Sequence, residues 1–180
     1  MNGFQATRPS PCPGRTAPCT VAIMQPMYLP WQGFFELIAA SDVFVHLDDV
    51  LLPQGRSFTN RVQIKTREGQ AWLTVPLRRD ERGTIRDTRI DISSPWQRKH
   101  LAMLEHAYSK APYTQDMLDL AAIVLEREWQ FLGEMNMAFV EATADWLGIR
   151  AEFVRSSDLS IDSTKSERIL DLVLHLGGEM

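Results

Sequence analysis

Residues 20–49 read TVAIMQPMYLPWQGFFELIAASDVFVHLDD and contain the strongest indications of the fold. The apolar run 20–25 predicts a strand, residues 32–40 predict a helix, and the β-branched and aromatic run 43–47 is typical of a buried strand. A strand, a short helix and a second strand within about thirty residues predict a βαβ unit with parallel strands.

The loop between the first strand and the helix is rich in residues that restrict the backbone. Pro26 and Pro30 each fix their own φ and hold the preceding residue in extended geometry, while Gly33 permits a close backbone approach. Ligands of open α/β sheets bind at the carboxyl ends of strands. We therefore expect a stiff loop that forms one wall of a ligand pocket. The substrate-binding residues predicted in it are Gln25, Tyr28, Trp31 and Gly33.

The remaining patterns complete an α/β fold. Residues 61–65 and 71–77 alternate around a turn at 68–69 and predict a β-hairpin. Further strands are expected at 88–92 and 151–154, and helices at 95–108, 114–126, 129–147 and 167–176. The predicted fold class is α/β, with a small mainly parallel sheet, a β-hairpin extension and a helical C-terminal half.

Composition bounds the function classes. A length of 180 residues favours one domain at 20–180, preceded by a disordered, proline-rich leader at 1–19. The net charge of −4 argues against nucleic acid as a partner. Apolar runs are too short for membrane insertion, and we expect a cytoplasmic protein. The sequence does not predict an oligomeric state.

Asp48 and Asp49 follow the second strand and are the first catalytic candidates. Adjacent strand residues point to opposite faces, so one carboxylate at most faces a given ligand. It would bind a metal, a sugar hydroxyl or an ammonium group; alternatively, the pair shapes a turn. His100, on a predicted helix, is a candidate general base. The four histidines do not form a metal-ligand pattern, so no metal site is predicted.

Two further groups suit an anionic ligand. Ser57 and Asn60 precede Arg61 and Lys65, which share one face of a strand and would hold a phosphate. A solvated edge strand is the alternative reading. The hydroxyls that follow the last strand would bind an anion or shape a turn; they belong to Ser156 and Ser157. Walker A, Gly-x-Gly-x-x-Gly and Gly-x-Ser-x-Gly motifs are absent, so no cofactor is assigned.

The chain resembles the WbqC-like proteins, which occur in bacterial O-antigen and other surface-polysaccharide gene clusters. The matching segments are QPMYLPWQGFFELI, DVFVHLDDV, SFTNRVQIKT, WLTVPL, IDISSPWQRKHLAMLEHAYSKAPY, NMAFVEATADWLGI, RSSDLS and KSERILDLVLHLGG. The resemblance implies a role in O-antigen biosynthesis. A transferase acting on a nucleotide-activated sugar, with group transfer to an amino sugar, is the leading reading. A non-catalytic sugar-nucleotide-binding or accessory protein of that pathway is the alternative.

The proline-rich leader at 1–19 is not part of the resemblance. Members of the family continue beyond the Leu-Gly-Gly at 176–178, so we expect this chain to lack their usual C-terminal segment.

Overall fold

The computed structural model describes residues 19–55, 57–78 and 83–178. Three parallel strands form its main sheet in the order β1-β2-β5: β1 (Val21–Met24), β2 (Val43–His46) and β5 (Glu152–Arg155). Helix α1 (Gln32–Ala39) connects β1 to β2, whose register runs from Val21↔Val43 to Met24↔His46. The predicted parallel βαβ unit is confirmed.

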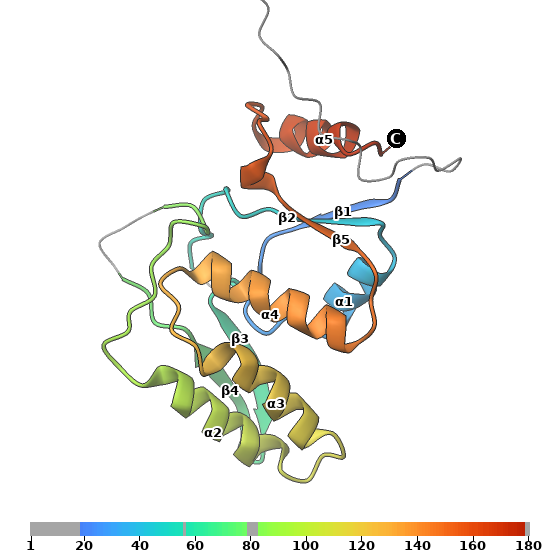
Figure 1. Ribbon diagram of the computed structural model, residues 1–180. Helices are drawn as coiled ribbons and strands as arrows, with labels where there is room; N and C mark the ends of the chain where they lie inside the picture. The colour runs from blue at the N-terminus through green and yellow to red at the C-terminus, as the bar shows by residue number, and fades with distance from the viewer. Residues whose placement is uncertain (1–18, 56, 79–82, 179–180) are drawn as a thin grey trace, which may run out of the picture.

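Helices cover both faces of this sheet, which explains why all four residues of β2 are buried. Val43 and Val45 pack in a cluster with Leu172 of α5 (Lys165–His175). Phe44 points to the opposite face and packs with α1 and with Val140 of α4 (Leu132–Trp146). Figure 1 shows α5 on one side of the sheet and α1 and α4 on the other.

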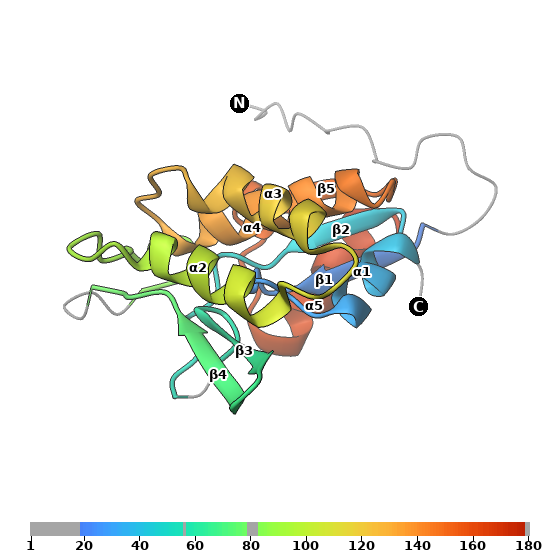
Figure 2. The same cartoon turned by 90° about the horizontal axis from the view of Figure 1, so that it is seen from below.

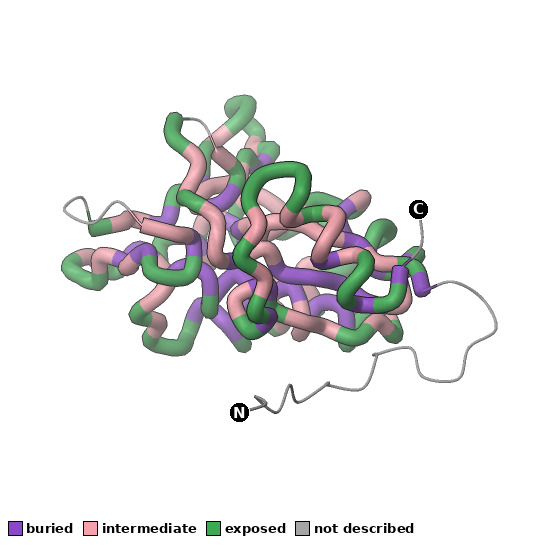
Figure 3. The backbone as a smooth tube through the Cα atoms, turned by 90° about the horizontal axis from the view of Figure 1, so that it is seen from above, coloured by how far each residue is buried: buried purple, intermediate pink, exposed green. Residues whose placement is uncertain are grey.

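A second core lies beyond α4. The antiparallel hairpin of β3 (Arg61–Thr66) and β4 (Gly69–Thr74) packs its inner face against α2 (Trp96–Tyr108), with α3 (Thr114–Leu125) alongside. In Figure 2 the hairpin projects from the edge of the molecule, and its outer face carries no helix. Buried stretches of the chain gather in the centre, and exposed ones lie at the periphery (Figure 3).

Some predicted boundaries are wrong. Residues 88–92 do not form a regular strand, because Arg89 and Ile90 make isolated bridges to Phe131 and Leu77. Helix α2 begins one residue later than predicted, at Trp96. Its N-cap is Pro95, and no side-chain hydrogen bond caps this end of the helix. Helix α5 begins two residues earlier than predicted, at Lys165, and α4 begins later, at Leu132. The predicted leader lies almost wholly outside the described residues.

No helix in the described part of the chain combines the length and apolarity needed to cross a membrane.

Candidate functional site

Polar side chains converge where β2 and β5 end, as the fold predicts for a ligand-binding edge. We call them the sheet-edge cluster. Asp48 and Asp49 follow β2, the serines belong to the 3₁₀ turn Ser156–Asp158 after β5, and α5 contributes an arginine. The members of the cluster are Asp48, Asp49, Ser156, Ser157 and Arg168.

Asp48 holds this cluster together from inside. Its side chain is fully buried. Its Oδ1 accepts from the Ser157 N–H (3.1 Å) and lies 3.1 Å from the Ser156 hydroxyl oxygen, and its Oδ2 accepts from the Ser157 hydroxyl (2.8 Å). Buried carboxylates require such partners. The geometry therefore assigns Asp48 a positioning role for the turn after β5.

Asp49 is the more accessible acid. Its Oδ1 accepts from the Ser156 hydroxyl at 2.7 Å, and its Oδ2 pairs with the Arg168 guanidinium. The Asp49 side chain is 20% exposed and that of Arg168 is 13% exposed. An incoming hydroxyl or ammonium could therefore reach Asp49 but not Asp48.

His100 is a core residue in the structure, which corrects its expected role as a general base. It is 6% exposed, and its Nδ1 lies 2.7 Å from the hydroxyl of Tyr28, itself 3% exposed. Burial lowers the pKa of His100 to about 4, opposed in part by a hydrogen bond with the Thr74 backbone. Tyr28 accordingly braces the loop from within and does not present its ring as a pocket wall.

The predicted stiff loop is held in place by a residue that the sequence did not single out. Asn136 of α4 donates from Nδ2 to the carbonyls of Pro26 (3.1 Å) and Thr59 (2.7 Å). The Tyr28 N–H also bonds the Phe58 carbonyl at 3.1 Å. Leu29, which follows these anchored residues directly, has φ +45°, a left-handed conformation that is strained for leucine.

The other loop candidates lie near the start of α1. Trp31 is 69% exposed, and its ring covers Gly33 so closely that a Cβ there would lie 1.9 Å from the ring. Gly33 is thus required for the close approach of Trp31. Gln25 is half-buried directly after β1.

The outer face of the hairpin gathers cationic, amide and aromatic groups. Cross-strand pairs place Arg61, Gln63 and Lys65 opposite Thr74, Trp72 and Gln70 respectively. The Arg61 guanidinium lies 4.9 Å from the Trp72 ring centre, and the Phe58 ring lies 6.1 Å from that of Trp72. Arg61 and Lys65 therefore share a face, as predicted. We call this surface, with Phe58, the hairpin face.

Ser57 and Asn60 shape the loop that leads into the hairpin. The Ser57 hydroxyl lies 2.8 Å from the Thr59 hydroxyl, and Asn60 Nδ2 donates to the Val75 carbonyl at 3.2 Å. Both polar groups are therefore engaged within the protein.

The predicted site residues thus form separate groups. Within the described ranges, no hydrogen bond or ion pair links the sheet-edge cluster to Arg61 or Lys65. Nor do those ranges contain a group of three His, Cys, Asp or Glu side chains placed to hold a metal ion. The separation of these groups is not visible in the sequence, because it depends on where the hairpin packs against the rest of the fold.

Comparison with known proteins identifies the chain's relatives. It is 37% identical over 155 residues to the "Uncharacterized protein Rv1507c" of Mycobacterium tuberculosis, a match that covers 84% of this chain and 66% of that protein. The chain therefore spans slightly less than two thirds of this relative. No solved structure matches. The model of the WbqC-like protein family matches residues 25–180, and the chain belongs to that family.

Proposed function

We propose that the chain recognises a nucleotide-activated sugar on its hairpin face and serves surface-polysaccharide (O-antigen) biosynthesis in the cytoplasm. One observation carries the proposal: Arg61 stacks on an exposed Trp72, with Lys65 on the same face. Arginine and lysine suit phosphate oxygens, and an exposed aromatic ring suits a base or the apolar face of a sugar.

The surroundings of Arg61 support an anionic ligand. One terminal nitrogen donates to the Gly55 carbonyl at 3.2 Å. The buried Nε has no hydrogen-bond partner among the described residues. Because a buried N–H without a partner costs free energy, a ligand oxygen at this position would be favourable. Gln63 and Gln70, joined at 2.8 Å, offer amide groups to hydroxyls beside it.

The turn end of the hairpin supplies room for a ligand. A hollow of about 500 Å³ is lined by residues that include Gln63, Lys65 and Gln70. Known small-molecule sites occupy roughly 300–1,000 Å³. The hollow therefore suits one sugar-phosphate unit at the cationic end of the hairpin face.

Titration with UDP-N-acetylglucosamine and UDP-glucosamine by isothermal calorimetry tests recognition. Arg61→Ala and Trp72→Ala should each weaken binding by about tenfold or more, since a charged hydrogen bond or a stacked ring contributes about 1–3 kcal/mol. The controls are Arg98→Ala, an exposed arginine on α2, and Trp146→Ala, an exposed tryptophan at the end of α4. Unchanged affinity in the Arg61 and Trp72 variants would refute the hairpin face as the binding site.

Turnover separates an enzyme from an accessory binding protein. With these sugars and an acyl donor, mass spectrometry detects a new product only if the chain is a transferase. In that case Asp49, the accessible acid of the sheet-edge cluster, is the proposed base, which requires the sugar end of the ligand to extend from the hairpin face to that cluster. Asp49→Asn should then abolish product while nucleotide-sugar affinity is retained. The control is Asp158→Asn, because Asp158 is an exposed acid in the 3₁₀ turn that contributes Ser156 and Ser157 to the cluster. Binding without product supports the accessory role.

A further inference from the structure

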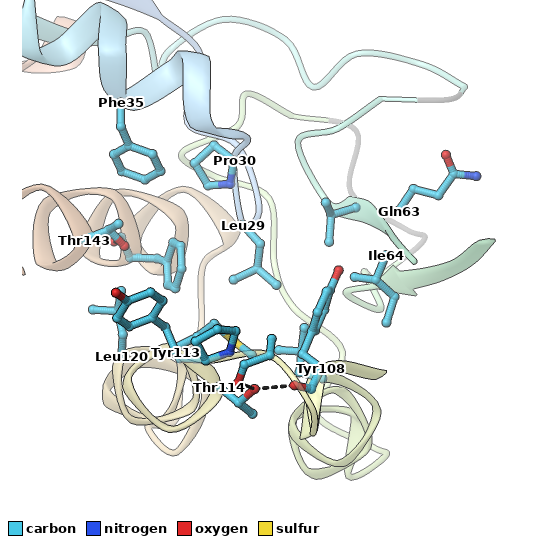
Figure 4. A pocket seen from close by; sticks show the side chains of 17 residues that line it. Leu29, Pro30, Phe35, Gln63, Ile64, Tyr108, Tyr113, Thr114, Leu120 and Thr143 are labelled. Atoms are coloured by element: carbon cyan, nitrogen blue, oxygen red, sulfur yellow. Dashed lines mark hydrogen bonds between the residues drawn. The ribbon is translucent and has the colours of Figure 1, made fainter. Parts of the chain in front are cut away.

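A cavity of about 480 Å³ lies behind the stiff loop (Figure 4). Leu29 and Pro30 of the loop meet Ile64 of β3 there, and Tyr108 and Tyr113 from the α2–α3 junction line the opposite side. The fold must bring together segments that are distant in sequence to create this space. Its volume falls within the range of small-molecule sites.

The chemistry of the cavity wall is apolar. None of its 17 lining residues is Asp, Glu, Lys, Arg or His. The Thr114 hydroxyl contacts the Tyr108 and Ala111 carbonyls, the latter at 2.9 Å, and the Thr143 hydroxyl donates to the Phe139 carbonyl (2.7 Å). Both threonine hydroxyls therefore hydrogen-bond to backbone carbonyls and are not available to a ligand.

This wall selects among ligand classes. A peptide or an unmodified sugar would bury N–H, C=O or hydroxyl groups with few partners, which is unfavourable. The present cavity is partly open to solvent, so a ligand in it would remove its apolar wall from water. A hydrocarbon chain satisfies both the volume and the absence of polar partners.

Backbone strain at the cavity wall also indicates a binding role. Leu29 lines the cavity in the left-handed conformation, φ +45°, although leucine rarely adopts it. The hydrogen bonds to the Pro26 carbonyl and from the Tyr28 N–H hold the loop just before the strained residue. Strain of this kind is characteristic of ligand-binding sites.

We infer that the cavity binds a hydrocarbon chain of the acyl type. The chain lies between Leu29, Ile64 and Leu104, and its polar end emerges beside exposed Gln63 and Tyr113. In Figure 4 the Gln63 amide points away from the other labelled side chains, as a residue at the rim would. The inference rests on observations other than those behind the proposed sugar site, although Gln63 and Ile64 line both hollows.

A chain-length series tests this inference with the intact protein. Hexanoate, octanoate and decanoate are titrated by calorimetry, and each buried methylene should tighten binding about fourfold, which is ~0.8 kcal/mol. The decanoyl thioester of pantetheine is titrated beside decanoate. Binding of both would show that the chain alone is recognised, whereas binding of the thioester only would identify an acyl donor. Affinity that does not change with chain length would overturn the inference.

Filling the cavity supplies the second arm of the test. Ala121→Trp places a large ring in the cavity and should abolish binding of decanoate and its thioester. Met117→Trp, at a half-buried lining position, covers the possibility that Ala121→Trp does not fold. Ile123→Trp, on an exposed position of the same helix, is the matched control. If a folded cavity-filling variant binds as tightly as the control, the ligand lies elsewhere and the inference is wrong.

Discussion

Acidification should destabilise the protein through His100. The Tyr28 hydroxyl lies 2.7 Å from His100 Nδ1, and both side chains are buried. Burial raises the pKa of the Tyr28 phenol, so its hydroxyl keeps its proton and donates it to Nδ1. His100 is therefore neutral in the folded protein, with its own proton on Nε2.

The magnitude follows from the pKa of the same ring in the two states. Burial lowers the His100 pKa from 6.5 to about 4 in the folded state. Between these values the unfolded chain binds a proton that the folded protein does not, so stability falls as the pH falls. The difference of about 2.5 pKa units corresponds to a loss of at most about 3 kcal/mol. The full contribution of His100 is present above about pH 6.5.

Urea unfolding at a series of pH values measures this loss. His100→Gln cannot titrate, so the difference in unfolding free energy between this variant and the parent protein should change by about 1–3 kcal/mol between pH 7 and pH 4. His106→Gln is the matched control, because His106 is an exposed histidine on the same helix. If the His100 and His106 variants lose stability in parallel with the parent on acidification, the reasoning about a buried neutral imidazole is refuted.

Substitutions at two further positions test how the loop and the sheet edge are held. Asn136→Leu leaves the carbonyls of Pro26 and Thr59 without their donor, and thermal unfolding should reveal a loss of about 2–4 kcal/mol; Asn136→Asp should not rescue it, because a carboxylate offers no N–H. Arg168→Gln removes the partner of Asp49 and should cost about 1–3 kcal/mol, with loss of protection in α5 by hydrogen exchange. Parental stability in either variant would contradict the assigned contact.

The main sheet was predictable because its signals are local. The run 43–47 is too apolar for a one-sided strand, and the short helix before it leaves only a parallel connection to the first strand. The hairpin was predictable for the same reason, since alternation and a turn residue lie within one stretch. The strand expected at 88–92 failed because alternation there reflects two isolated bridges to residues far along the chain.

The candidate site depended on contacts between distant residues, which no local pattern contains. The order of two parallel strands and the position of the last strand placed Asp48 near Ser156, 108 residues away. No local sequence pattern indicates that Tyr28 hydrogen-bonds His100, 72 residues away, or that Asn136 on a helix bridges two loops. Tyr28 and His100 were predicted to be accessible to a ligand, although the second core encloses both side chains.

The two proposed ligands would contact mainly alternate residues of a single strand, β3. Successive side chains of β3 point to opposite faces, so Val62 and Ile64 line the apolar cavity while Arg61 and Lys65 lie on the hairpin face. A sugar phosphate needs the cations and finds none in the cavity wall; a hydrocarbon needs the wall and gains nothing from the cations. Gln63 and Ile64 line both hollows, so the two sites adjoin. Each proposal nevertheless rests on its own groups, the cations and Trp72 in one case and the apolar wall in the other, and the failure of either leaves the physical basis of the other intact.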